Sequence, residues 1–108
     1  MEIKVTDVFL RCVKPIAKRY RSFNQDYQRL LDELENNPKL GVDLGNGFHK
    51  VRMAIRSKGK GKSGGARIIT LDLVERNGIL YLIYAYDKSD AESISIEILK
   101  KLVNKLDL

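Results

Sequence analysis

The fold is decided by residues 66–86, which read ARIITLDLVERNGILYLIYAY. Two runs rich in β-branched and aromatic side chains, residues 66–75 and residues 79–86, flank the turn signal Arg76-Asn77-Gly78. An Asn-Gly pair between two such runs is typical of a β-hairpin. The second run is almost entirely apolar, so we expect its strand to lie in the interior of a sheet.

A third strand is predicted upstream, where the hydrophobic period changes to two. Apolar residues occupy one of its faces, and the other face carries Lys50, Arg52 and Arg56. Because unpaired cations are too costly to bury, we expect this face to be open to solvent. Arg67, at the start of the next strand, should join the same face and complete a concave basic surface. Residues 57–65, rich in glycine and lysine, are predicted to form a mobile loop between the two strands.

The N-terminal half is predicted to contain a short strand and two amphipathic helices. Residues 2–5 read as the strand, and apolar residues then recur at helical spacing over residues 8–20 and 27–34. Pro15 lies within the first helix and should kink or divide it. Residues 40–47 are expected to be a glycine-containing connector that leads to the basic strand.

Three serines mark the positions where helices are expected to begin. Ser22, followed by Gln25, has the spacing of a capping box for the second helix. Ser89, followed by Glu92, has the same spacing ahead of a closing amphipathic helix near the C-terminus. Ser95 is an alternative start for that closing helix.

These elements predict a single α+β domain over residues 1–108, in the order β-α-α-β-β-β-α. Short turns join the last three strands, so the sheet should be mainly antiparallel and backed by an N-terminal helical hairpin. No apolar run approaches the roughly 20 residues of a membrane span. Residues 1–5 also lack the pattern of a signal peptide. We therefore expect a cytoplasmic protein that does not associate with membranes.

The charged residues are segregated along the chain, which has a formal net charge of +6. No acidic residue lies between Phe48 and Arg67, whereas acids gather over residues 26–35 and near the C-terminus. Segregation of this kind predicts one electropositive surface that attracts a polyanion. A solvated basic loop without a partner would have the same composition.

The basic strand and the tyrosines Tyr84 and Tyr86 form a pattern that suits single-stranded RNA. Cations hold phosphates, and tyrosine rings stack on unpaired bases. The pattern also suits metal-free cleavage, in which a ribose 2′-hydroxyl attacks the adjacent phosphorus. Because no carboxylate lies beside the basic strand in the sequence, a lysine with a lowered pKa would have to serve as the base. A surface that only binds RNA would have the same sequence pattern.

Neither a metal site nor a catalytic triad is predicted, and no cofactor is expected. His49 and Cys12 are each the only residue of their type, so no set of metal ligands or nucleophile–histidine pair can be assembled at suggestive spacing. His49 alternates with Lys50 and should therefore face inward, as a hydrogen-bonded core or edge histidine.

Four motifs together resemble the HigB-like branch of the RelE/ParE superfamily of bacterial toxins. They are Lys39-Leu40-Gly41 with Gly45-Asn46-Gly47, Lys50-Val51-Arg52, the stretch GKSGGARII at residues 61–69, and Tyr81-Leu82 through Tyr86-Asp87-Lys88-Ser89. The resemblance covers the whole chain in order and length. It implies a RelE-like, microbial RNase-like fold and the toxin of a type II toxin–antitoxin system. Such a toxin is a metal-independent endoribonuclease (mRNA interferase) that cleaves mRNA in the ribosomal A site and arrests translation.

The resemblance also implies partners and residue roles. The partners would be the 70S ribosome with its mRNA and a cognate antitoxin that carries a DNA-binding domain. The implied catalytic residues are Lys50 and Arg52 near the scissile phosphate, Arg67 as the group that stabilises its charge, Lys88 and Tyr86. Tyr86 would replace a C-terminal tyrosine of the family, near whose place this chain has Ile94. A core role is the alternative for Tyr86. The residues expected to bind RNA or the ribosome are Arg56, Lys58, Lys60 and Lys62.

Two other functions remain open at the level of sequence. A ParE-like relative would share the fold and inhibit DNA gyrase, although the dense cations of the basic strand argue against it. A degenerate toxin would bind the ribosome or RNA without cutting.

Overall fold

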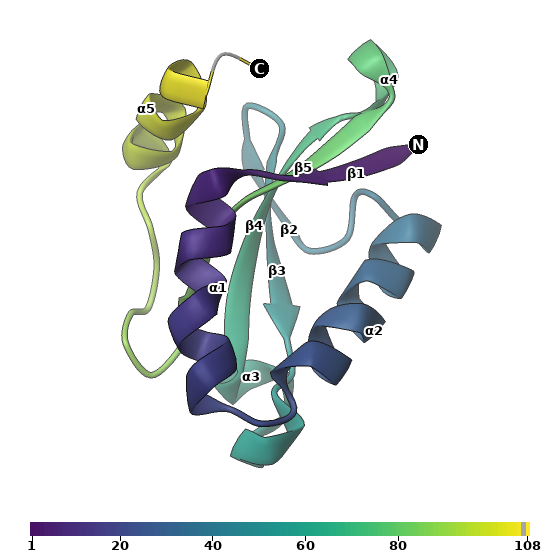
Figure 1. The fold of residues 1–108 in the computed structure, drawn as a ribbon. Coiled ribbons are helices and arrows are strands. Elements are labelled where there is room, and N and C mark those ends of the chain that lie inside the picture. The colour runs from purple at the N-terminus through teal and green to yellow at the C-terminus, as the bar shows by residue number, and fades with distance from the viewer. Residues whose placement is uncertain (107) are drawn as a thin grey trace.

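The computed structural model describes residues 1–106 and 108. The protein is built on a five-stranded mixed sheet with helices on both faces (Figure 1). The strands are β1 (Glu2–Val5), β2 (Val42–Gly45), β3 (Phe48–Met53), β4 (Ala66–Leu73) and β5 (Ile79–Asp87). The helices are α1 (Asp7–Arg19), α2 (Phe23–Asn36), the 3₁₀ helix η1 (Arg56–Lys58), α3 (Gly61–Gly64), α4 (Val74–Asn77) and α5 (Ile96–Leu106).

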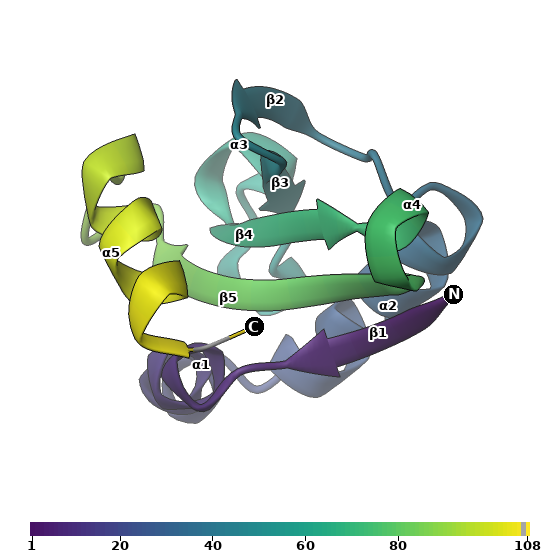
Figure 2. The same ribbon diagram turned by 90° about the horizontal axis from the view of Figure 1, so that it is seen from above.

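The strands lie in the order β1-β5-β4-β3-β2, with β1 and β2 at opposite edges (Figure 2). The interior position predicted for the apolar strand β5 is confirmed. The prediction of a mainly antiparallel sheet is wrong, because β1 pairs in parallel with β5 beside three antiparallel pairings. Short connections join β2 to β3 and β4 to β5, whereas a longer segment that contains η1 and α3 joins β3 to β4. The parallel pair joins segments from opposite ends of the chain and is held by long-range packing.

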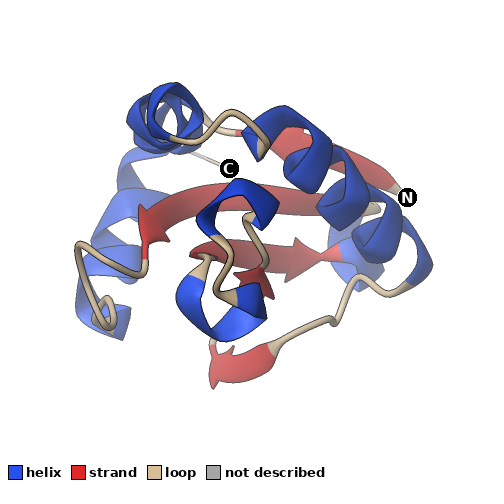
Figure 3. Ribbon diagram, turned by 90° about the horizontal axis from the view of Figure 1, so that it is seen from below, coloured by secondary structure: helices blue, strands red, loops and turns tan. Residues whose placement is uncertain are grey.

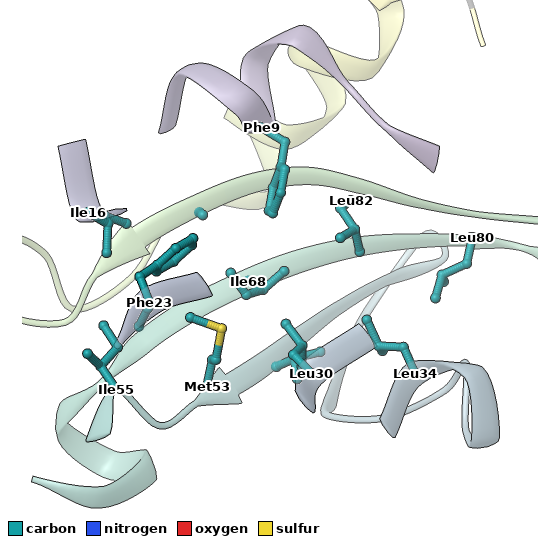
Figure 4. Packing of buried hydrophobic residues seen from close by; sticks show 13 residues of the cluster. Phe9, Ile16, Phe23, Leu30, Leu34, Met53, Ile55, Ile68, Leu80 and Leu82 are labelled. Atoms are coloured by element: carbon teal, nitrogen blue, oxygen red, sulfur yellow. The ribbon is translucent and has the colours of Figure 1, made fainter. Parts of the chain in front are cut away.

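Helices α1 and α2 cover one face of the sheet. Their buried residues Phe9, Leu30 and Leu34 pack with Ile68 and Leu82 of the sheet (Figure 4). The N-cap of α1 is Thr6, whose side chain accepts a hydrogen bond from the Phe9 amide. Helix α1 runs through Pro15 as one element, so the expected division does not occur.

Helix α5 covers part of the opposite face. Leu99 is fully buried there against Phe48, Ile69, Leu71 and Tyr81. The sheet is therefore the middle layer of three, and its two faces have separate apolar cores. In the described part of the chain, no helix is long and apolar enough to cross a membrane.

The predicted start of α2 is confirmed, because Ser22 is its N-cap residue, but the predicted cap hydrogen bond is absent; the cap predicted at Ser89 is wrong. The Ser22 hydroxyl does not cap α2 and instead donates to the Asp26 carboxylate, at 2.6 Å. Helix α5 begins at Ile96, well after Ser89, and the Ser95 side chain accepts from the Ile98 amide at 3.3 Å. The alternative start at Ser95 is therefore confirmed. The capping-box spacing does not show whether a serine makes the cap hydrogen bond. At Ser22 the hydroxyl is hydrogen-bonded to the nearby Asp26 carboxylate instead.

Two segments predicted as loops contain regular structure. The connector over residues 40–47 includes β2, and Gly41 precedes this strand with φ of +98°. A side chain at Gly41 would collide with the Lys50 carbonyl, so glycine permits the close approach to β3. Residues 57–65 contain most of η1 and all of α3, and these two short helices lie next to each other in the view from below (Figure 3). Since β3 ends at Met53, Arg56 belongs to η1 and not to the strand.

Candidate functional site

The strand register places Arg52, Arg67 and Tyr86 in one row across three adjacent strands. Arg52 of β3 lies opposite Arg67 of β4, and Arg67 lies opposite Tyr86 of β5. Directly opposite residues of antiparallel strands point to the same face, and Lys50, two residues before Arg52 on β3, points to that face as well. The cations Lys50, Arg52 and Arg67 therefore share a sheet face, as the alternation predicts.

Arg67 is on the predicted face but is not exposed to solvent. It is only 6% exposed, and its guanidinium donates to the carbonyls of Lys62 (3.0 Å) and Ser63 (2.9 Å). The expectation of an open Arg67 is wrong because α3 folds over it and supplies oxygen acceptors that offset the cost of burial. Arg67 consequently anchors α3 to the sheet.

Arg52 and Arg67 are neighbours in this row and form a like-charged pair. Burial, followed by the positive charge of Arg52, lowers the pKa of Arg67. Arginine nevertheless remains protonated in proteins, so the two positive charges oppose each other across the strands. An anion placed against both side chains would relieve that repulsion.

Tyr86 is a buried aromatic residue, which was the alternative left open by the sequence. It is 7% exposed, and its hydroxyl donates to the carbonyl of Glu92 at 3.3 Å. Burial raises the pKa of Tyr86 despite the opposing positive charge of Arg67, so the hydroxyl keeps its proton at neutral pH. Its ring lies beside that of Tyr84, with a centroid separation of 6.4 Å.

Lys58 differs from the other cations of this region because it is buried in an ion pair. Its Nζ lies 2.6 Å from Asp87 Oδ1 and 3.3 Å from the Gly65 carbonyl, and its side chain is 7% exposed. The expectation that Lys58 is a surface lysine is therefore wrong. Lys58 can be buried because Asp87 neutralises its charge. The sequence did not single out Asp87 for a structural role.

The Asp87 carboxylate joins three parts of the fold. Its side chain is fully buried and also accepts from Arg19 Nη1 (2.7 Å) and the Tyr20 hydroxyl (2.6 Å). We refer to Asp87, Lys58, Arg19 and Tyr20 as the Asp87 cluster. This cluster ties the end of α1 and the segment after β3 to the end of β5. The only hint of this cluster in the sequence is that the long apolar strand β5 ends in an aspartate.

We expect substitution of Lys58 to lower stability far more than substitution of Lys60. Lys58→Met should lower the free energy of unfolding by roughly 2–4 kcal/mol, because it leaves a buried carboxylate with fewer partners. Lys60→Met, at an exposed position, should change it by less than about 0.5 kcal/mol. Urea unfolding of the two variants tests the difference. Equal, small effects would contradict the assignment of Lys58 to the Asp87 cluster.

A groove runs along β3 between this strand and α2. Strand β2 pairs with β3 as far as Lys50, and beyond that point two adjoining cavities of about 180 and 210 Å³ flank β3. Glu33, Arg52 and Lys62 line both cavities. We call this feature the basic groove, and its cationic residues are Arg29, Lys50, Arg52, Arg56 and Lys62.

Two carboxylates of α2 also line the basic groove, contrary to the expectation that none lies beside the basic strand. Asp26 is buried and committed to the Ser22 hydroxyl and to the Arg56 amide, at 2.6 and 3.1 Å. Glu33 is half-exposed, and its Oε2 lies 3.9 Å from Lys62 Nζ. Asp26 and Glu33 lie in α2, which is separated from β3 in the sequence by β2 and its connections. No local spacing in the sequence therefore predicts that these carboxylates lie beside β3.

The remaining candidates lie outside the basic groove. Lys60 is exposed just before α3, and Lys88 is half-buried just after β5, with its amide donating to the Gly65 carbonyl. His49 faces inward as predicted, but its Nδ1 has no hydrogen-bond partner among the described residues. The expectation of a fully hydrogen-bonded histidine is therefore wrong.

The arrangement favours binding of a polyanion. Five cationic side chains and two carboxylates line the basic groove, and the opposed Arg52–Arg67 pair adjoins it. Arginines bind phosphate through paired N–H donors, and Glu33 is a carboxylate that can accept a proton within the groove. The sequence matches no protein-family model.

Proposed function

We propose that this protein is the toxin of a type II toxin–antitoxin system and acts in the cytoplasm. In this proposal its fold is RelE-like, and it is a metal-independent endoribonuclease that cuts mRNA in the A site of the ribosome. The opposed pair Arg52 and Arg67, beside a groove of further cations, is the observation that carries the proposal. The groove cations suit binding of a phosphate backbone, and the Arg52–Arg67 pair concentrates positive charge where one phosphate could be cut.

In the proposed reaction a ribose 2′-hydroxyl attacks the adjacent phosphorus and the bond to the 5′ oxygen breaks. Negative charge develops on the phosphoryl oxygens, and Arg52 and Arg67 would stabilise it. Lys50 would hold the substrate phosphate beside Arg52. Glu33 adds a proton acceptor that the sequence did not suggest, and Lys88 and Tyr86 remain the candidates for the leaving oxygen's proton donor.

A toxin of this kind requires an inhibitor in the same cell. We propose a cognate antitoxin with a DNA-binding domain, whose acidic segment would cover the basic groove. The 70S ribosome and its mRNA are the other proposed partners, since the groove cations suit a phosphate backbone.

The isolated protein should cut naked mRNA poorly and should cut the same message efficiently on translating ribosomes. Lysine and arginine side chains are ordinarily poor proton acceptors, so we expect much of the rate enhancement to come from a ribosome that holds the 2′-hydroxyl in line. Positioning of that kind can contribute roughly 7–11 kcal/mol. Primer extension on both substrates measures the difference. Comparable cutting of both would show that the active site is complete without the ribosome.

The same experiment separates the other two functions. A ParE-like protein would leave the message intact and inhibit supercoiling by DNA gyrase. A degenerate toxin would bind ribosomes without producing cut ends.

A further inference from the structure

We infer that the basic groove holds the backbone of a single-stranded RNA along α2. In this inference Arg29 contacts a phosphate, and Lys62 exchanges its partner Glu33 for a phosphate when RNA binds. The inference rests on the proposed function in taking RNA as the polyanion. It adds a contact from α2, a helix in which the sequence suggested only packing residues.

The walls of the groove come from three separate parts of the fold. Helix α2 contributes Arg29, β3 contributes Arg52, and the segment of η1 and α3 contributes Arg56 and Lys62. This segment lies at the same end of the molecule as the first turn of α2 (Figure 1). The carboxylate of Asp26 fixes that arrangement, because it accepts from the Arg56 amide and from Arg29 Nη1, at 3.1 and 3.4 Å.

The spacing of the cations suits an extended polyanion. Lys50 and Arg52 are two residues apart on one strand, which separates them by about 7 Å. That separation is comparable with the distance between successive phosphates of an extended nucleic-acid strand. Arg29 and Arg56 line the adjoining cavity, where each planar guanidinium group can bind a phosphate through two N–H donors.

The basic groove also gives an RNA strand bound at the Arg52–Arg67 pair an unobstructed path. On the same sheet face, Phe48, Ile69 and Leu71 lie further along β3 and β4, where they pack with the buried Leu99 of α5. An RNA strand that ran from the Arg52–Arg67 pair along β3 and β4 in that direction would have to displace α5. A strand in the basic groove passes along β3, where the two cavities are already present.

The Lys62–Glu33 pair spans the two walls of this route. Its atoms are 3.9 Å apart, and both side chains are about half-exposed, at 61% and 46%. Such an exposed pair is weak, so a phosphate can replace Glu33 as the partner of Lys62. Glu33 therefore lowers affinity for a polyanion, whereas Arg29 raises it.

Binding of a fluorescent oligouridylate to the purified full-length protein tests these opposite signs. Arg29→Ala should weaken binding roughly fivefold and reduce the slope of log affinity against log salt by about 0.7, as expected for one lost phosphate contact. Glu33→Gln should tighten binding by about twofold to threefold at low salt. Asp26 keeps its bonds to Ser22 and Arg56 in the first variant, and urea unfolding verifies that both variants are folded.

Arg76→Ala is the matched control. Arg76 is an exposed arginine of α4, which lies at the opposite end of the molecule from α3 (Figure 1). Its loss removes the same charge and should leave affinity within about twofold, because it makes no phosphate contact. Equal weakening by Arg29→Ala and Arg76→Ala would mean that net charge alone binds RNA, and would overturn the inference.

A polyglutamate of matched length distinguishes RNA from an acidic protein segment. The proposed acidic antitoxin segment would occupy the same groove, so weak competition by polyglutamate is expected. If polyglutamate binds more tightly than the oligouridylate and shows the same response to Arg29→Ala and Glu33→Gln, the groove is a site for protein and not for RNA, and the inference is wrong. Cutting of mRNA on ribosomes is measured separately. Groove-dependent binding without cutting would remove the proposed function alone, and cutting with no effect of Arg29→Ala on binding would remove this inference alone.

Discussion

Replacing Asp87 with alanine should lower the free energy of unfolding by about 3–5 kcal/mol, the range for breaking a buried ion pair. The side chain is fully buried and accepts from Lys58, Arg19 and Tyr20. Its removal leaves the ammonium of Lys58, itself 7% exposed, without a counter-charge. Urea unfolding should show a lower midpoint with little change in slope, because the surface exposed on unfolding is nearly the same.

Asp90→Ala is the control for this prediction. Asp90 also pairs with Arg19, at 3.0 Å, but its side chain is 58% exposed. Exposed pairs contribute little, so its loss should cost less than about 1 kcal/mol. Adding Lys58→Met to Asp87→Ala should recover part of the stability, because the second substitution removes the unpaired buried charge. A further loss in the double variant would contradict this explanation.

The Asp87 cluster also predicts how stability depends on pH. Burial opposes ionisation of Asp87, but hydrogen bonds from Lys58 and Tyr20 outweigh it and hold the pKa of this carboxyl well below its usual range. In the unfolded chain the pKa returns to about 3.9. The stabilisation is therefore complete above that value and is lost as pH falls below it towards the folded pKa. The wild-type protein should lose stability more steeply than Asp87→Ala as pH falls below about 4.

The second large effect is expected from Arg67→Ala, which should reduce cutting of mRNA on ribosomes by at least about 10²-fold. In the proposed reaction, Arg67 stabilises charge that develops in the transition state, so most of the loss should appear in the rate of cutting and not in ribosome binding. Single-turnover cleavage and ribosome co-sedimentation measure the two quantities separately.

The burial of Arg67 provides a competing explanation that the experiment must exclude. Its guanidinium holds α3 through the carbonyls of Lys62 and Ser63, so its loss could also displace Lys62 from the basic groove. That effect would weaken ribosome binding as much as cutting. Equal losses of binding and cutting would assign Arg67 to holding α3 and would contradict its catalytic role. Lys62→Ala, which removes the groove charge and retains Arg67, gives the comparison.

Local patterns in the sequence determined most of the secondary structure. The alternation around Val51 and the Asn77-Gly78 signal identified β3, β4 and β5 and their antiparallel order, since these strands are neighbours along the chain. The same alternation placed Lys50, Arg52 and Arg67 on one face. Side-chain direction in a strand has a period of two, so sequence parity and register are sufficient to determine it.

Only the tertiary structure decided which of the charged residues are free. Lys58 and Asp87 are 29 positions apart, and Asp26 and Arg56 are 30 apart. No local periodicity links such residues. Burial of a charge depends on whether distant segments bring acceptors to it, as α3 does for Arg67 and β5 does for Lys58. The parallel pairing of β1 with β5 and the approach of Glu33 to Lys62 arise in the same way, because they depend on how helices pack against the sheet and not on the residues beside them.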